Sequence, residues 1–206
     1  GFRQLNFISA PVTDYEDIIT VGGTENRGRI IEAIIEKIYE SKGWDSFMLK
    51  CVKHSSPNFI PLNNIVLKNS KRMSISLIAH KDGAPYLPIS GEWSEYRSSL
   101  DKNFLADTKR QMSRLEGKHR LNFSEADAST DIPALIDKLV ELRIARHQAL
   151  KAKSIFNNPA VADFFKTISY AFFDKGWLSL NYLVLDDEIA AVHLGFKKDG
   201  RLYYYI

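Results

Sequence analysis

The spacing of apolar residues switches along the chain between a helical period of about 3.6 and the alternation typical of strands. After a predicted loop at residues 22–25, isoleucines at helical spacing predict an amphipathic helix that ends at Gly43. Alternating apolar residues predict a strand over residues 44–52, with Cys51 as a small buried residue, and another over residues 74–80. The first third of the chain therefore predicts mixed helix and strand.

The middle of the chain returns to helical spacing. After a short expected strand at residues 85–88, one helical stretch is predicted over residues 90–117, where Gly117 supplies the C-terminal stop. Basic side chains cover its outer faces: Lys102, Lys109, Arg110, Arg114, Lys118, His119 and Arg120. Such a face could contact tRNA, an anionic lipid headgroup or a CoA phosphate. It also carries carboxylates and lacks the interleaved aromatic residues that stack bases, so a solvated face is the alternative.

The last third predicts two helices and three closely spaced strands. Each helix has a capping side chain and a proline at its start, at residues 130–133 and 157–159. The strands cover residues 178–185, 189–196 and 201–206. Because their connecting turns are short, they should form an antiparallel meander after a strand through Leu121 and Phe123. The fold class is therefore α+β.

Composition limits the class of protein but does not identify a reaction. The 206 residues are 45% hydrophobic, which supplies a core, and the net charge of +3 is no signature of nucleic-acid binding. No apolar run approaches the roughly 20 residues that span a bilayer, and no signal peptide is recognisable. A single cysteine cannot form an internal disulfide, so a cytoplasmic location is expected. Both ends of the chain look cut, and we expect an internal piece of a longer protein.

No nucleophile, metal or phosphate motif is present by spacing, and no metal site is expected. Two histidines lie in predicted elements and have alternative interpretations. His147 falls near a helix end, where a cation meets the carbonyl dipole, so a structural role is the default. His193 falls in a strand, where it is either a hydrogen-bonded core residue or a catalytic base.

Four segments, in this order, resemble the FemAB/CelD-like acetyltransferases of the GNAT superfamily. They are Asp14-Tyr15 with the later Gly43-Trp44-Asp45, Pro85-Tyr86-Leu87-Pro88 with Trp93-Ser94-Glu95-Tyr96, the arginine-rich stretch from Thr108 to Leu115, and the hairpin from Asp186 to Tyr205. The resemblance covers nearly the whole chain through loose patterns of apolar and turn residues. It departs from the family at Arg143 and at Arg146-His147, where members usually have a histidine and an Arg-Trp pair.

The resemblance implies a GNAT-like α+β fold, with a mixed, mainly antiparallel sheet flanked by helices, in two pseudo-repeated units. Residues 1–90 would be the remainder of the first unit. Residues 91–206 would be the second unit, truncated before the loop that binds the donor.

The implied activity is transfer of an acyl group, acetyl in the first place, from acyl-CoA to an amine or hydroxyl of a small-molecule or saccharide acceptor. Envelope or polysaccharide biosynthesis is the implied pathway. A noncatalytic binding module of GNAT shape is one alternative. A Fem-type transferase that uses aminoacyl-tRNA is another, less favoured one. The oligomeric state stays open.

This type of transfer needs a proton acceptor and a groove for the acceptor molecule, because the acceptor attacks the thioester directly. The catalytic candidates are His193 and Tyr204. The candidate substrate-binding residues are Asp14, Tyr15, Arg146, Tyr203 and Tyr205.

Overall fold

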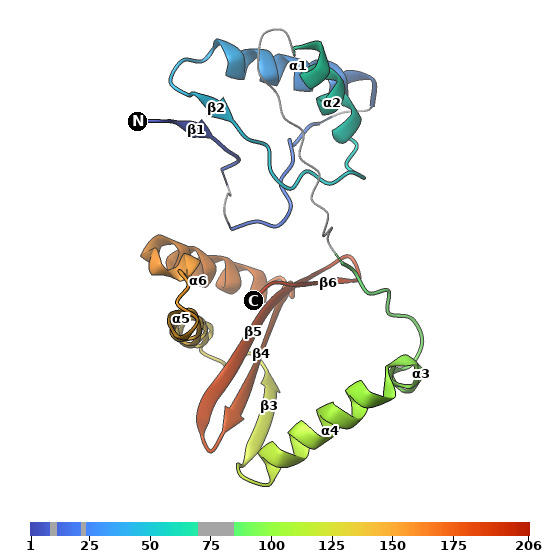
Figure 1. Cartoon of the computed structure of the whole chain (residues 1–206), viewed down its shortest axis with the longest axis vertical. Helices are drawn as coiled ribbons and strands as arrows, with labels where there is room; N and C mark the ends of the chain where they lie inside the picture. The colour runs from blue at the N-terminus through green and yellow to red at the C-terminus, as the bar shows by residue number, and fades with distance from the viewer. Residues whose placement is uncertain (9–11, 22–23, 70–84) are drawn as a thin grey trace. The chain divides into compact units, whose positions relative to one another are not determined.

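The computed structural model describes residues 1–8, 12–21, 24–69 and 85–206 (Figure 1). The chain divides into two compact units, Gly1–Tyr86 and Leu87–Ile206. Residues 22–23 of the predicted loop and the predicted strand at 74–80 lie outside the described residues, whereas residues 24–25 are helical and not part of a loop. None of the helices in the described ranges is long and apolar enough to cross a bilayer.

The described part of the first unit packs two helices beside a pair of very short strands. Its elements are β1 (Gln4–Leu5), α1 (Thr24–Glu40), β2 (Ser46–Phe47) and α2 (Phe59–Lys68), with β1 and β2 parallel. Ile31 and Ile35 of α1 are buried against Leu62 and Ile65 of α2. The isoleucine stripe therefore forms the helix that its spacing predicted.

Two predicted strands and the predicted burial of Cys51 were wrong, and one helix was missed. The strand expected over 44–52 is limited to β2, and Cys51 is exposed with a φ of 55°, so it is not a core residue. Residues 85–88 form no strand. Helix α2 was missed because Pro61 and the asparagines at 63–64 weaken its helical signal, although Pro61 lies in the first turn, where proline is tolerated.

The second unit is built on a four-stranded antiparallel sheet in the order β3-β4-β5-β6. Its elements are α3 (Trp93–Ser99), α4 (Lys102–Glu116), β3 (Leu121–Glu125), α5 (Ile132–Ala149), a 3-10 turn (Ile155–Asn157), α6 (Pro159–Phe173), β4 (Leu178–Leu185), β5 (Glu188–Lys198) and β6 (Arg201–Tyr204). Figure 1 shows α5 and α6 on one side of the sheet and α4 on the other. The mixed helix and sheet composition and the C-terminal meander are as predicted.

Capping side chains explain where the helices of the second unit begin. Asp131 accepts a hydrogen bond from the Ala134 N–H, and Asn158 accepts one from the Ala160 N–H, each with proline in the first helical turn. Asp101 accepts a hydrogen bond from the Phe104 N–H, which starts α4 as a separate helix. The single stretch predicted over 90–117 is therefore two helices.

The residue types at the two turns of the meander suit the backbone conformation of these turns. The turn from β4 to β5 has Asp186 and Asp187 at φ 50° and 76°, and that from β5 to β6 has Asp199 and Gly200 at φ 50° and 70°. Positive φ at both central residues is the requirement of a type I′ hairpin turn, which Asp-Gly and similar pairs meet best.

The core of the second unit lies between α5, α6 and one face of the sheet. Leu180 of β4 and Leu194 of β5 are fully buried, as are Ile136 of α5 and Phe165 of α6. Phe164 is 43% exposed, because Phe165 and Ser169 are the residues of α6 that face inward. The helices thus cover one face of the sheet, and the candidate site lies on the other face.

Candidate active site

A row of polar side chains crosses the sheet on the face opposite α5 and α6. Along β5, Leu194 faces the helices, so its neighbour His193 faces the other way. His193 is paired with Asn181 of β4, and Asn181 is paired with Glu125 of β3. Because directly paired residues share a face, Glu125, Asn181 and His193 lie side by side on three strands.

Tyr204 of β6 extends this row to the fourth strand. Its ring stacks on the imidazole of His193, with ring centroids 4.4 Å apart and an interplanar angle of 26°. The side chain of Tyr204 is 76% exposed, so the histidine is covered by a residue that itself faces solvent. The two residues predicted as catalytic are therefore in direct contact.

The environment of His193 favours a neutral imidazole. Burial lowers the pKa of His193 below its ordinary value. Its Nε2 atom is buried and has no hydrogen-bond partner among the described residues. In the tautomer that carries its proton on Nδ1, Nε2 is thus an unused acceptor. A desolvated neutral imidazole with an unused acceptor nitrogen is suited to take a proton from a bound molecule.

Gly195 explains how β6 comes so close to His193. A Cβ atom placed at Gly195 would lie 2.8 Å from the carbonyl oxygen of Tyr203 and 3.2 Å from Cε1 of His193. The backbone oxygen cannot give way as a flexible side chain would. Only glycine therefore fits at this position without displacing β6 or the imidazole.

Polar contacts on the same face surround the row. The Asn181 amide donates to the Ser179 hydroxyl at 3.3 Å, and Ser179 is buried. The ammonium group of Lys197 on β5 forms an ion pair with the carboxylate of Glu125 on β3, which links two strands that are not neighbours. The site thus combines a neutral base with hydrogen-bonding groups on a rigid sheet.

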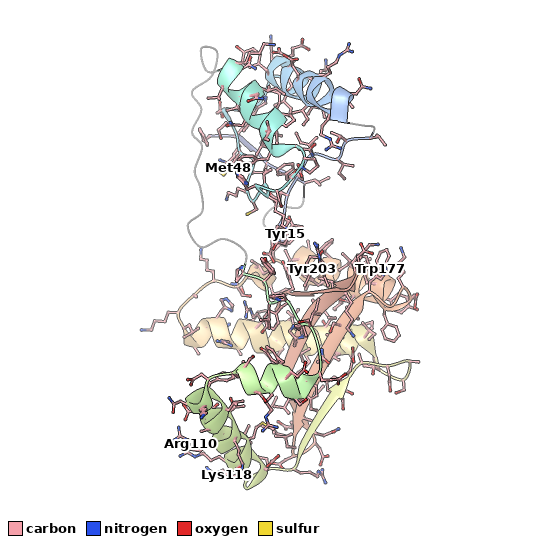
Figure 2. All side chains as sticks on the ribbon, turned by 90° about the vertical axis from the view of Figure 1, so that its right-hand side faces the viewer. Tyr15, Met48, Arg110, Lys118, Trp177 and Tyr203 are labelled. Atoms are coloured by element: carbon pink, nitrogen blue, oxygen red, sulfur yellow. The ribbon has the colours of Figure 1, made fainter. Side chains whose placement is uncertain are left out.

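The other tyrosines of β6 point away from His193. Tyr205 packs between Phe165 and Phe196, with ring centroids 5.4 Å and 6.2 Å away, on the side of the helices. Tyr203 is paired with Phe196 and is partly exposed (Figure 2). Because side chains alternate along a strand, Tyr204 alone of the three shares the face of His193.

The remaining predicted residues lie elsewhere in the chain. Arg146 is exposed in the last turn of α5. Asp14 and Tyr15 belong to the first unit, where Tyr15 lies beneath the ammonium group of Lys53, 4.8 Å from the ring centroid. Tyr15 and Lys53 also line a hollow of about 270 Å³ in that unit. Substrate binding by these residues stays a prediction.

Sequence reasoning missed Asn181, Ser179 and Gly195. Asn181 was detectable, because it is a polar residue within the apolar run Leu178–Leu185, and a meander with two-residue turns places it beside His193. Glycine is needed at position 195 because β6 passes close to it, and this contact cannot be recognised from the sequence. Over the described ranges, no group of three or more His, Cys, Asp or Glu side chains could hold a metal ion.

The fold and the site together define an α+β domain whose sheet presents a neutral histidine suited to proton transfer. The model of the Acetyltransferase (GNAT) domain family matches residues 102–206, and the chain belongs to this family. The match runs from α4 to the end of the chain, so it contains the whole sheet. No curated protein and no solved structure matches the chain. The predicted GNAT membership is confirmed, and the narrower FemAB/CelD-like assignment stays a prediction.

Proposed function

We propose that the chain contributes to an acyltransferase that moves an acyl group, acetyl in the first place, from acyl-CoA to an amine or hydroxyl. Membership of the GNAT family supports acyl transfer in general. The observation that carries the proposal is the buried Nε2 of His193, which has a lowered pKa and no partner among the described residues. We propose His193 as the base that removes the acceptor's proton.

The proposed chemistry needs no covalent intermediate with the protein. Acyl-CoA supplies an activated thioester carbonyl when it is bound. The acceptor's nitrogen or oxygen bonds to that carbonyl carbon while Nε2 of His193 takes the acceptor's proton. The carbon–sulfur bond then breaks, and the departing thiolate takes a proton, so His193 returns to its neutral form.

Tyr204 is proposed to control access to His193. Its ring covers the imidazole and its side chain is mostly exposed, so a turn of this side chain would open Nε2 to the acceptor. Its phenol then relays the proton: it donates its own proton to the thiolate and takes the proton held by His193 in return. We keep Tyr203, Tyr205, Arg146, Asp14 and Tyr15 as proposed substrate contacts, although the packing of Tyr205 against Phe165 also gives it a structural role.

The finer assignments rest on the resemblance of the sequence. We propose a saccharide or other envelope precursor as acceptor, and a cytoplasmic location. The single cysteine of the chain, Cys51, is free and exposed, which fits a reducing compartment.

Replacement of His193 by glutamine tests the proposal, because glutamine keeps hydrogen bonding and cannot take a proton at neutral pH. In the intact protein, we expect thiol release from acetyl-CoA, with a panel of amine and saccharide acceptors, to fall about 10²- to 10⁴-fold. The thermal shift caused by acetyl-CoA should be retained. His54→Gln, which removes an exposed histidine of the first unit, is the matched control.

Three results would contradict the proposal. Unchanged turnover in His193→Gln would remove His193 from the mechanism. Stabilisation of the wild-type protein by acetyl-CoA, with no thiol release for any acceptor, would favour the noncatalytic binding module. Stabilisation by aminoacyl-tRNA alone would favour a Fem-type transferase.

The pH dependence of the wild-type rate follows from the direction of the pKa shift. His193 would act as a base in its neutral form, and its pKa is lowered. The plateau of kcat/KM should therefore extend to pH values lower than about 6.5, the ordinary pKa of histidine, before the rate falls with acid. The acid limb should coincide with the titration of His193 followed by NMR. Tyr204→Ala should raise the measured pKa of His193, because it uncovers the ring.

A further inference from the structure

Helix α4 exposes an apolar stripe. None of its residues is buried, and Phe104 and Met112 are 58% and 41% exposed. Phe104, Thr108, Met112 and Leu115 follow one another at intervals of four, four and three residues, so they form one line along the helix. A helix within a folded unit normally buries such a line, and this one leaves it largely open.

Unpaired positive charge accompanies the stripe. Residues 102–120 contain six Lys or Arg against two carboxylates. Arg110 pairs with Asp107 at 2.7 Å, and Arg120 pairs with a carboxylate of the β4–β5 turn. Lys102, Lys109, Arg114 and Lys118 form no ion pair in the part of the chain that the structure describes. Figure 2 shows Arg110 and Lys118 along α4 and at its C-terminal end.

Aromatic residues extend the exposed apolar surface into α3. Trp93 is 67% exposed, and its only ring contact among the described residues is Tyr96, with centroids 5.5 Å apart. Ile89, just before α3, is also exposed. Tryptophan and tyrosine are the residues that favour the boundary between headgroups and acyl chains.

We propose that α4, with α3 before it, lies in the plane of an anionic bilayer surface. An apolar line beside unpaired Lys and Arg, on a helix of low overall hydrophobicity, is the pattern of interfacial helices. The stripe would enter the acyl boundary, and Lys102 and Lys109, seven residues apart on one line, would reach anionic headgroups. A nucleic acid would contact the basic side chains and leave Phe104 and Met112 in water. A bilayer would contact both the basic and the apolar side chains, so we favour the bilayer.

The C-terminal end of α4 is attached to the sheet, so docking would also orient the domain. The His119 imidazole and the Arg120 N–H both contact the carboxylate of Asp186, and the Arg120 guanidinium pairs with Asp187. These contacts join the segment after α4 to the β4–β5 turn.

Flotation of the intact protein with vesicles tests the proposal. We expect binding to vesicles of 30% phosphatidylglycerol in phosphatidylcholine, little binding to pure phosphatidylcholine, and weakening by salt. Lys109→Glu with Arg114→Glu should lower the partition coefficient at least tenfold, since each basic side chain near an anionic surface is worth about 1 kcal/mol. Phe104→Ser with Met112→Ser should lower it by a similar factor.

Matched control variants test whether the expected loss of binding is specific to α4 or follows from any similar change of charge or apolar surface. Lys42→Glu with Lys50→Glu makes the same charge change at exposed positions of the first unit. Ile60→Ser with Leu67→Ser removes exposed apolar residues from α2. Both pairs should float like wild type.

A fluorescent label reports insertion directly. In a Cys51→Ser background, an environment-sensitive dye at Met112→Cys should shift to the blue on anionic vesicles. The same dye at Ser113→Cys, one residue away on the polar side, should not.

Several outcomes would overturn the proposal. One is the absence of vesicle binding. Another is binding that needs the charges but neither Phe104 nor Met112, with no shift at position 112, because that is adsorption without insertion. Salt-sensitive RNA binding in place of vesicle binding, or self-association that protects the dye at position 112, would show that α4 has a different partner.

Discussion

The two units of this chain differ in how their structure is encoded. In the second unit, strands of eight and eleven residues are joined by two-residue turns, and capping side chains mark the starts of α5 and α6. In the first unit, the described strands have two residues each, and they pair residues about forty positions apart. The meander β4-β5-β6 of the second unit is therefore specified largely by neighbours in sequence. The strands of the first unit, and β3 of the second, which pairs with β4 across α5 and α6 in the sequence, depend on contacts distant in sequence.

The two units also differ in the elements that hold their candidate functional residues. Glu125, Asn181, His193 and Tyr204 lie on four adjacent strands, and two-residue turns join the last three of these strands. The hollow beside Tyr15 in the first unit is lined by residues of two loops, 15–17 and 53–57. Sites on rigid elements hold their geometry more closely than sites on loops, so the sheet is the better place for proton transfer.

Core truncations should give the largest effects and test whether the units are separate in stability. Leu194→Ala and Ile35→Ala should each cost about 2–5 kcal/mol, because both remove buried methyl groups. Hydrogen exchange should show lost protection in β4, β5 and α5 for the first variant, and in α1 and α2 for the second. Leu150→Ala, at an exposed position, is the control. Loss of protection in α1 upon Leu194→Ala would show that the units unfold together.

Alanine at two glycines should have opposite effects in the two units. Gly195→Ala should destabilise by about 1–3 kcal/mol, because its Cβ meets the Tyr203 carbonyl oxygen at 2.8 Å. Gly28→Ala in α1 should stabilise by up to about 1 kcal/mol, because its Cβ would have nothing within 4 Å and alanine favours helix. Urea unfolding measures both. A neutral Gly195→Ala would mean that β6 does not approach β5 as described.

Much of the second unit could be predicted because its signals are local. The pairs Asp131 with Pro133 and Asn158 with Pro159 mark helix starts, and Asp199-Gly200 marks a hairpin turn. The likeness of the hairpin to a known family suggested His193 and Tyr204 as candidates, and the structure places their two rings in contact.

Local backbone conformation explains one failure, and tertiary contact explains two others. Cys51 sits in an alternating apolar run, yet its backbone takes a positive φ and the chain leaves the strand after Phe47. Helix α2 gains its stability from packing Leu62 and Ile65 against α1, which its own residues do not reveal. The role of Gly195 likewise depends on another strand. The helix and the glycine were thus decided by tertiary contact.

The smallest predicted effect concerns the attachment of α4 to the sheet. The hydrogen bond from the His119 side chain, followed by that from the Arg120 N–H, holds the pKa of Asp186 below its ordinary value. A carboxylate with a lowered pKa stabilises the folded state above its unfolded value, about 3.9, and this contribution is lost as the pH falls through the folded pKa. Because the pair is exposed, the change should be small.

Asp186→Asn therefore tests whether this contact orders the end of α4. At neutral pH it should speed amide exchange at His119 and Arg120, and acidification of the wild type below about pH 4 should do the same. Asp127→Asn is the matched variant, because the pKa of Asp127 is also lowered, by the Ser129 and Thr130 hydrogen bonds of its own turn. It should affect only residues 127–131. If Asp186→Asn leaves exchange after α4 unchanged, the turn of the meander does not hold this helix, and the rigidity of the second unit stops at the edge of its sheet.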